Sequence, residues 1–492
     1  MQTVVEVLEW AAGTHGDRDA YVDGDRRITF EQFGAMSDGI ATSLQDRGVK
    51  HGDVVTLLMP SSIDFALCYM AAMKVGAITS AVNPRLGPNE RASISHRTSP
   101  VLTVAPDTLD VGSEWGTVLR VGELSQLYTR GTPRLAVRLH DADTVAIVWT
   151  SGTTGLPQGA VYDHRCLKAI HEGMGDLSAP GDRRVVSLPF AHVGYMTRAW
   201  DDIANTVTMV LVPDPWTADK QVDLLERERI TMATGVPTQW VKMLECPRLA
   251  EIDLSLLRLA GIGGAAVAPE LVRAVRQRLG CAVMTRYTST EAGLATGTQL
   301  SDSDEVVATT VGVPSSVVEM RLVAPGTDAT VGQGNVGEIR LRSPAMFRGY
   351  WNDPEGSADA LDNDGFLRTG DLGYATPEGN LRIVGRLKEM YIRGGYNVYP
   401  AEVEAVLSEH PAIIAAAVVG APDPIVGEIG VAFLVVDSQH SPPSLSDVRD
   451  WCRSQLADYK SPERLVCVEE LPVNAMHKVD KTILREQAKE YV

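Results

Sequence analysis

Cysteine is scarce in this sequence, and its spacing excludes two kinds of protein. The 492-residue chain has six cysteines, Cys68, Cys166, Cys246, Cys281, Cys452 and Cys467. None of them forms a C-x-x-C pair or another metal-ligand spacing. Scattered single cysteines are typical of a reducing compartment, where they mostly fill cores. The sequence therefore predicts neither a disulfide framework nor a cysteine-based metal centre.

A long hydrophobic run is also lacking. The longest apolar stretch, from about Phe65 to Thr79, is interrupted by Lys74 and is too short to cross a bilayer. The first residues, Met1 to Glu6, carry neither a basic region nor an apolar run, so no signal peptide is expected. We therefore expect a cytoplasmic protein without stable membrane insertion.

Basic residues are fewer than acidic ones in this sequence. The chain has 45 Lys and Arg against 63 Asp and Glu, which gives a net charge of −18. This balance argues against nucleic acid or an anionic membrane as the main partner. A small anionic ligand stays open, because a single site can be locally positive.

What the sequence does contain is an alternation of short apolar runs and amphipathic segments. This order predicts parallel α/β sheets. Residues 310–385 carry shorter, turn-rich runs, which indicate an antiparallel or barrel-like subdomain. After residue 385 the pattern becomes α+β. Because 492 residues are too many for one core, we expect a large N-terminal domain over 1–385 and a small C-terminal domain over 386–492.

The most informative stretch is a loop rich in Gly, Ser and Thr. It runs from Thr150 to Gly159, directly after the apolar strand pattern 144–149. Glycines allow close approach of the backbone, and hydroxyls donate to phosphate oxygens. The loop does not fit the Walker pattern. A plain surface turn is the alternative, but four hydroxyls among three glycines after a buried strand favour a phosphate-binding loop.

Four further motifs follow this loop in a fixed order. They are Tyr287-Thr288-Ser289-Thr290-Glu291, Arg368-Thr369-Gly370-Asp371, Gly385-Arg386-Leu387-Lys388 and the late lysine Lys478. With them, the sequence resembles the adenylate-forming (AMP-binding) superfamily, in its acyl-CoA synthetase branch. The resemblance covers about Asp19 to Arg485, and the ordered set is far more specific than any single motif.

The resemblance implies a two-step ligase reaction. A carboxylate attacks the α-phosphate of ATP, giving acyl-AMP and pyrophosphate. The C-terminal domain then rotates, and the thiol of coenzyme A displaces AMP. Such chemistry needs alignment and charge neutralisation more than covalent protein chemistry. ATP, Mg²⁺ and coenzyme A are the implied cofactors, and the substrate is a small carboxylic acid.

The resemblance also implies which residues contact ATP. They are Thr150, Ser151, Gly152, Thr153, Thr154, Gly155, Gln158, Gly264, Ala265, Tyr287, Thr288, Ser289, Asp371 and Arg386. Tyr287 is expected to stack on adenine, and Asp371 is expected to hold the ribose hydroxyls. Glu291 and Thr154 are the implied metal contacts, and Thr290 is a phosphate donor. Without the resemblance, Glu291 fits an acidic first helical turn and Asp371 fits a turn residue.

Three positions in or next to these motifs depart from the family pattern. Gln158 stands where the family usually has Lys, and losing one preorganised donor costs on the order of 10²-fold in rate. His477 stands where Gly is usual before the lysine, and His is less comfortable than Gly if φ is positive. Thr288 replaces a common Gly. Lys478 is the implied catalytic lysine, which bridges the carboxylate and the α-phosphate; Lys481, further along, is the runner-up.

The acyl pocket, the hinge and the coenzyme A loop are implied in the same way. The implied pocket residues are His192, Trp240, Gly263 and Gly264. The implied catalytic residues are Lys478, Glu291, Thr290 and again His192. The implied hinge and coenzyme A residues are Lys388, Arg393, Gly394, Gly395 and Tyr396. A Trp at position 240 would shorten or flatten the pocket. That favours an aromatic, cyclic or short-to-medium acid over a long linear one, although plain core packing explains Trp240 equally well.

Two other functions stay open at this stage. One is an adenylating enzyme that loads a carrier-protein thiol. The other is a degenerate member that binds a nucleotide or acyl ligand without turnover, which Gln158 and His477 motivate. The loop from Arg393 and the lack of a fused carrier domain favour free coenzyme A. Fatty acid metabolism is the expected context, and a homo-oligomer is left open.

Overall fold

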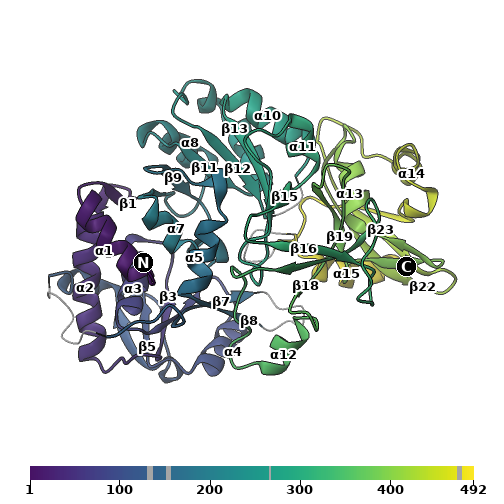
Figure 1. Ribbon diagram of the computed structural model, residues 1–492. Coiled ribbons are helices and arrows are strands. Elements are labelled where there is room, and N and C mark those ends of the chain that lie inside the picture. The colour runs from purple at the N-terminus through teal and green to yellow at the C-terminus, as the bar shows by residue number, and fades with distance from the viewer. Residues whose placement is uncertain (130–136, 151–156, 265–266, 474–478) are drawn as a thin grey trace.

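The computed structural model describes residues 1–129, 137–150, 157–264, 267–473 and 479–492. This part of the chain folds into four sheets with helices packed on them (Figure 1). Two sheets are mainly parallel, a third is antiparallel, and a fourth belongs to the C-terminal domain. The predicted α/β class is therefore confirmed. No described helix is long and apolar enough to cross a membrane.

The first mainly parallel sheet carries the predicted phosphate loop at its edge. Its strand order is β6 (Thr117–Arg120), β5 (Leu102–Ala105), β3 (Val54–Leu58), β4 (Ile78–Val82), β7 (Thr144–Thr150) and β8 (Gln158–Asp163). Neighbours are parallel except β7 and β8, which pair in antiparallel fashion. Strands β3 and β4 are buried along their whole length, as expected for parallel strands covered on both faces.

The second sheet has nine strands. Their order is β15 (Val313–Pro314), β14 (Thr296–Gly297), β13 (Ala282–Tyr287), β12 (Leu259–Gly263), β11 (Met232–Gly235), β9 (Arg183–Val186), β10 (Thr208–Leu211), β1 (Asp19–Asp23) and β2 (Arg26–Thr29). Six consecutive strands, from β13 to β1, are parallel. The hairpin predicted around Asp23-Gly24-Asp25 is confirmed by the antiparallel pair β1 and β2.

The N-terminal helices pack on the two sheets. They are α1 (Val4–His15), α2 (Phe30–Asp46), α3 (Ile63–Lys74), α4 (Pro88–Thr98), α5 (His164–Glu172), α6 (Val193–Met196), α7 (Ala199–Ala204), α8 (Ala218–Arg227), α9 (Pro237–Glu245), α10 (Pro269–Leu279), α11 (Asp304–Thr309) and α12 (Pro354–Asp359). Helix α2 begins at the predicted N-cap: the Thr29 hydroxyl accepts from Gln32 N, and Gln32 returns a contact to Thr29 N.

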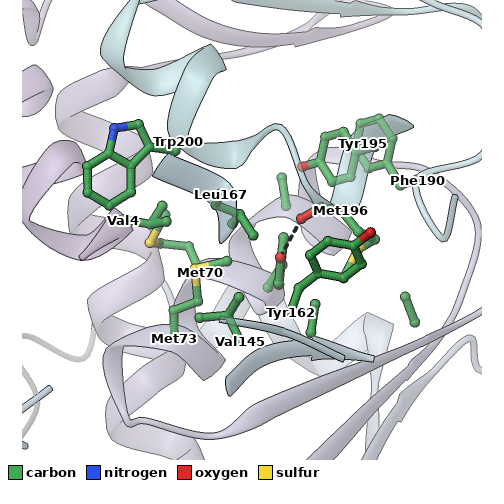
Figure 2. Packing of buried hydrophobic residues seen from close by; sticks show 14 of the residues in the cluster. Val4, Met70, Met73, Val145, Tyr162, Leu167, Phe190, Tyr195, Met196 and Trp200 are labelled. Carbon is green, nitrogen blue, oxygen red and sulfur yellow. Dashed lines mark hydrogen bonds between the residues drawn. The ribbon is translucent and has the colours of Figure 1, made fainter. Parts of the chain in front are cut away.

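One large hydrophobic cluster joins the two mainly parallel sheets. Figure 2 shows part of it, with Val4 of α1, Met70 of α3, Val145 of β7, Leu167 of α5 and Trp200 of α7 packed together. A second cluster lies under α8, α9 and α10 on the other face of the nine-stranded sheet. Both faces of that sheet are therefore fixed by packing, which leaves the strand ends to carry polar chemistry.

The predicted barrel-like part is an open sheet. Its order is β16 (Glu319–Val323), β17 (Gly337–Arg342), β18 (Leu367–Ala375) and β19 (Leu381–Arg386), and all neighbours are antiparallel. In the described part of the chain β16 and β19 are its two edges and do not pair with each other. The sequence pattern of short, turn-rich strands is common to open sheets and barrels, so it could not separate them.

The C-terminal domain, at the yellow end of the chain in Figure 1, has its own sheet and cores. The strand order is β21 (Tyr396–Val398), β20 (Tyr391–Arg393), β23 (Gly427–Val436) and β22 (Ile413–Asp423), with β24 (Arg464–Cys467) parallel to β23. Helices α13 (Pro400–Ser408), α14 (Leu445–Arg453) and α15 (Lys481–Ala488) pack on it. The boundary between residues 385 and 386 stays a prediction.

Candidate active site

A buried carboxylate on the antiparallel sheet meets partners from two other strands. Asp371 of β18 lies opposite Arg386 of β19 in the strand register, and Arg386 Nε is 3.0 Å from Asp371 Oδ1. The Tyr287 hydroxyl, at the end of β13, donates to Asp371 Oδ2 at 2.6 Å. The structure thus brings together three residues predicted for the adenosine end of ATP.

Burial and hydrogen bonding oppose each other at Asp371. Burial raises the pKa of Asp371, while Arg386 and the Tyr287 hydroxyl favour its charged form and limit the rise. In turn, Asp371 raises the pKa of Arg386. The Arg386 side chain is 63% exposed, whereas Tyr287 is buried. Because Arg386 is exposed, two hydroxyl groups of a ligand can take its place as hydrogen-bond donors to Asp371. The two hydroxyls of a ribose have this arrangement.

Glu291 is held in place by aromatic residues. The Tyr350 hydroxyl donates to Glu291 Oε1 at 2.9 Å, and Phe347 N donates to the Glu291 carbonyl at 2.9 Å. Next to it, the Tyr162 hydroxyl donates to the carbonyl of Thr290. The carboxylate is oriented through one oxygen, which leaves the other oxygen for a ligand.

This arrangement fits a magnesium ion that arrives with a nucleotide. Mg²⁺ usually keeps several waters and binds one or two carboxylates together with substrate phosphates. Among the described residues, no group of three or more His, Cys, Asp and Glu side chains could hold a metal by itself. Glu291 offers the single oriented carboxylate that such a shared site needs. Thr154, the other predicted metal contact, lies outside the described residues.

The ends of the predicted phosphate loop are fixed by strand pairing. Thr150 closes β7, Gln158 opens β8, and the two are antiparallel partners. The loop residues Ser151, Gly152, Thr153, Thr154 and Gly155 lie outside the described residues. On its other side β8 contacts residues 348–351, where Trp351 N donates to the Gly159 carbonyl at 2.7 Å. Because Tyr350 in that segment holds Glu291, the base of the loop and Glu291 are neighbours.

Gln158 faces a carboxylate. Its Nε2 is 3.5 Å from Asp353 Oδ2, a long contact. Asp353 also caps α12, since its Oδ1 accepts from Gly356 N at 2.8 Å. A cation at position 158 would therefore meet a negative partner before it met a phosphate.

The glycine-rich end of β12 lies beside β13. Gly263 is the register partner of Arg286. Of the described residues beyond its chain neighbours, a Cβ on Gly263 would meet within 4 Å only the Arg286 carbonyl, at 3.3 Å. Gly264 has a φ of +82°, a conformation that strains other residues. Its neighbour Ala265 is outside the described residues.

Trp240 lies in the second cluster, under the far face of the same sheet. It is fully buried, and its indole Nε1 donates to the Gly261 carbonyl at 3.2 Å. Gly261 and Gly263 turn their Cβ positions toward the opposite face, where Leu177 and the large cluster lie. The structure favours the core-packing alternative for Trp240, and a direct acyl contact stays a prediction.

His192 caps the short helix α6. Its Nδ1 accepts from Gly194 N at 3.2 Å. On either side of it in the sequence, Phe190 and Tyr195 stack with ring centroids 3.6 Å apart, as Figure 2 shows from close by. Phe190 and Tyr195 are both buried in the large cluster, and the role of His192 in the pocket stays a prediction.

The predicted hinge lies between the antiparallel sheet and the C-terminal domain. Lys388 follows β19, and Arg485 of α15 donates to its carbonyl at 3.4 Å. Just before it, Gly385 has a φ of +152° and would place a Cβ 3.5 Å from the Tyr399 Cβ. Gly385 thus lies within β19 and packs close to Tyr399, the residue before α13, and the hinge role of Lys388 stays a prediction.

The predicted coenzyme A loop forms the tip of a hairpin. Arg393 ends β20 and pairs with Glu463. Gly394 and Gly395 follow with φ of +55° and +87°, and a Cβ on either would meet no atom of the described chain within 4 Å. Tyr396 is largely exposed and stacks on Tyr459, with centroids 4.6 Å apart. Two glycines with open space beside them fit close approach of a ligand, and this role stays a prediction.

Lys478 lies outside the described residues, but its runner-up does not. Lys481 Nζ, at the start of α15, is 2.7 Å from Glu389 Oε2 and 2.8 Å from Glu404 Oε1. Burial lowers the pKa of Lys481, yet the two carboxylates outweigh it, and the pKa is raised. Lys481 is therefore engaged in joining α15 to the hinge segment, which supports Lys478 as the catalytic candidate.

Two residues near the site carry no motif signal. Tyr350 and Tyr162 orient Glu291 and Thr290, yet they lie 59 and 128 residues away in sequence. Only the pairing of residues 348–351 with β8 brings Tyr350 there. A sequence search for chemistry-bearing residues alone had no reason to select them.

The fold and the site together define a nucleotide-dependent ligase of the adenylate-forming class. Comparison with known proteins agrees. A family model described as AMP-binding enzyme matches residues 8–351, and one described as AMP-binding enzyme C-terminal domain matches residues 402–478. The chain belongs to the AMP-binding enzyme family, and it is an AMP-forming acid–CoA ligase that uses ATP, Mg²⁺ and coenzyme A.

Individual relatives are similar along their whole length. The chain is 32% identical to long-chain-fatty-acid–CoA ligase FadD13 of Mycobacterium tuberculosis, with 99% of each chain covered. It is 32% identical to 4-coumarate–CoA ligase CCL1 of Humulus lupulus, covering 95% of this chain and 91% of the relative. The crystal structure of ATP-bound MatB from Rhodopseudomonas palustris matches with a TM-score of 0.91, 27% identity and 99% of each chain covered.

Proposed function

We propose that this ligase activates an aromatic, cyclic or short-to-medium carboxylic acid and passes it to free coenzyme A. The observation that carries the adenylation part is the meeting of Tyr287, Asp371 and Arg386 beside an oriented Glu291 at the base of the phosphate loop. The named relatives act on acids of different shape, a long-chain fatty acid for FadD13 and 4-coumarate for CCL1. The compact acid is supported here by the two stacked aromatic rings, Phe190 and Tyr195, that stand on either side of His192 in the sequence.

In this proposal each described residue has a stated task. Asp371 accepts from the two ribose hydroxyls, and Tyr287 covers the adenine. The hydroxyls of the loop and of Thr290 donate to phosphate oxygens, and Glu291 holds the magnesium ion that neutralises them. Lys478 bridges the acid carboxylate and the α-phosphate. After rotation about Lys388, the Arg393–Tyr396 turn lines the path of coenzyme A.

The test measures pyrophosphate release from ATP with a structurally diverse panel of acids. Each active acid is then offered coenzyme A or a phosphopantetheinylated carrier protein, and the thioester is identified by mass spectrometry. Release with a compact acid and transfer to coenzyme A support the proposal. Transfer to the carrier protein alone would replace it with the carrier-loading function. Bound ATP with no pyrophosphate from any acid would support a degenerate, non-catalytic protein.

We also propose a cytoplasmic location. Single cysteines without a disulfide partner support it, since five of the six are buried and all six are free.

A further inference from the structure

One guanidinium beside the predicted acyl pocket has no negative partner. Arg286 immediately precedes Tyr287 on β13 and is the register partner of Gly263. In the described chain no carboxylate lies within ion-pair distance of it, and its Nε is inaccessible to solvent without a hydrogen-bond partner. The residues that the structure does not describe, 130–136, 151–156, 265–266 and 474–478, contain no Asp or Glu. The missing partner therefore does not come from them.

Strand alternation fixes which way Arg286 points. Residues of β12 and β13 that face the second cluster are Ala260, Ile262 and Val283, and those that face the large cluster are Leu259 and Met284. Arg286, two residues after Met284, lies on the large-cluster face. Its Nη2 donates to the Met174 carbonyl on that side. The Cβ position of Gly263 is on this same face, and the Arg286 side chain extends over Gly297, its register partner on β14.

The charged groups around Arg286 are already engaged with one another. Asp201 accepts from His171 at 2.9 Å, from Arg198 at 3.0 Å and from Ser178 at 2.5 Å. Asp202 pairs with Arg184. Among the largely buried groups, Asp201 and Asp202 thus face Arg184, Arg198 and Arg286, which is one carboxylate fewer than the arginines; the exposed Asp176 also favours the charged form of Arg286, without an ion pair to it.

An uncompensated cation in such a place is costly. Burial, and after it the nearby Arg198, lower the pKa of Arg286 to about 10. Buried charges are normally paired, because removal from water is otherwise unfavourable. A guanidinium has five N–H donors, and the contacts of Arg286 use Nη2 with the Met174 carbonyl and, weakly, Nη1 with its sulfur at 3.6 Å. Donors are left for a planar anion.

We propose that Arg286 binds a second carboxylate of the substrate, so that the acid is a dicarboxylic acid. A carboxylate matches the planar fork of a guanidinium and can accept two N–H bonds at once. One carboxylate reacts at the α-phosphate, and the other pairs with the Arg286 guanidinium on the large-cluster face of the sheet. The inference rests on the proposed adenylation function and narrows its substrate class.

A purely structural role for Arg286 is the competing explanation. Through Met174 it anchors the segment that leads into residues Gly175–Leu177. Arg258 anchors the same segment from another side, donating to the Asp176 carbonyl at 3.0 Å and the Leu177 carbonyl at 3.4 Å while pairing with Asp182. Arg258→Met is therefore a matched control, since it loosens the same segment without removing the candidate anion partner.

The experiment compares linear and aromatic dicarboxylic acids with their monomethyl esters, which keep size but remove one charge. Pyrophosphate release is measured for the native chain, Arg286→Met, Arg286→Lys and Arg258→Met, each checked by thermal unfolding. We expect kcat/KM for the best diacid to exceed that of its ester by about 100-fold, as for a site whose polar group loses its partner. Arg286→Met should remove this preference, Arg286→Lys should keep part of it, and Arg258→Met should keep it.

The outcome separates the inference from the proposed function. Pyrophosphate release with monoacids alone, or equal loss with all acids in Arg286→Met, overturns the dicarboxylic substrate and leaves the ligase intact. If no acid releases pyrophosphate, the proposed function fails. Calorimetric binding of the diacids to the native chain and Arg286→Met, with a non-hydrolysable ATP analogue present, then decides the inference. Binding lost in Arg286→Met supports it, and binding that is absent or unchanged overturns it.

Discussion

In the large domain the candidate site is assembled by buried contacts, whereas the C-terminal domain meets the hinge through partly exposed charges. Asp371 is 6% exposed and held by Tyr287 and Arg386. Lys481 and Arg485 instead reach Glu389 and the Lys388 carbonyl across the hinge segment. Water partly reaches the ion pairs of Lys481 and screens them, and Arg485 contacts only a carbonyl. The difference suits a fixed nucleotide end and a domain that exchanges its contacts between two half-reactions.

The comparison is tested most strongly at Lys478. If the C-terminal domain supplies only the adenylation lysine, Lys478→Ala should slow acyl-AMP formation by roughly 10³-fold, the upper range for loss of one preorganised donor. Thioester formation from supplied acyl-AMP should stay near the native rate. Pyrophosphate exchange and stopped-flow thioester assays measure the two steps. Equal loss in both would sink the assignment, and Lys489→Ala, on the exposed end of the chain, is the control.

Substitution of Asp371 tests the buried contacts of the large domain. Removing a charged acceptor of two hydroxyls should cost about 3 kcal/mol, at roughly 1.5 kcal/mol for each hydrogen bond to a charged group. Asp371→Ala should therefore raise KM for ATP on the order of 100-fold. Steady-state kinetics with varied ATP measure it. Asp364→Ala, at an exposed aspartate that pairs with Arg321, should leave KM unchanged; an unchanged KM in Asp371→Ala as well would make Asp371 a turn residue.

The same contrast shows what the sequence could predict. Tyr287, Asp371 and Arg386 belong to ordered motifs, and the structure brings them together across 84 residues. These motifs can be recognised in the sequence because the chemistry requires particular residue types. Tyr350 has no such signature, because its place follows from the register of residues 348–351 on β8. Trp240 is a residue that the sequence singled out but could not place. A large aromatic side chain fits a pocket wall and a hydrophobic core equally well, and only the structure shows on which face of the sheet it lies.

The Tyr350→Phe variant tests how far the buried contacts of the large domain orient Glu291 for magnesium. Tyr350→Phe removes one hydrogen bond to the Glu291 carboxylate, worth about 1.5 kcal/mol for a bond to a charged group. We expect the half-saturating Mg²⁺ concentration for adenylation to rise roughly 10-fold, with KM for the acid little changed. Tyr374→Phe is the matched control, because the Tyr374 hydroxyl contacts Arg382 instead. A uniform fall in rate at all Mg²⁺ concentrations would argue for a packing role.

Lys481 probes the weaker contacts of the C-terminal side. Lys481→Met leaves Glu389 and Glu404 together without a cation. Because Lys481 is 16% exposed and its partners are 24% and 20% exposed, solvent screens part of the loss, and we expect about 1 kcal/mol of destabilisation. Both half-reactions should slow by a similar factor of roughly 5, since the pair joins α15 to the hinge and not to a substrate. Lys489→Met, which breaks the exposed pair with Glu486, should change neither rate. A loss confined to adenylation would instead place Lys481 in the catalytic step.

Substitution of Gln158 has the smallest of the expected effects on the adenylation rate, and the structure gives the reason. The family pattern favours Lys here, but the Gln158 amide faces Asp353, and a lysine would pair with that carboxylate before it reached a phosphate. A partly exposed ion pair is worth up to about 1 kcal/mol, enough to offset most of the added attraction. Gln158→Lys should therefore change the adenylation rate by less than about 5-fold, whereas Gln158→Lys combined with Asp353→Asn frees the cation and should raise it further. The Asn keeps the cap on α12, since its side-chain oxygen can still accept from Gly356 N. If the single variant already adenylates far faster, then Asp353 does not neutralise position 158, and the loop of the native chain is limited by its missing charge.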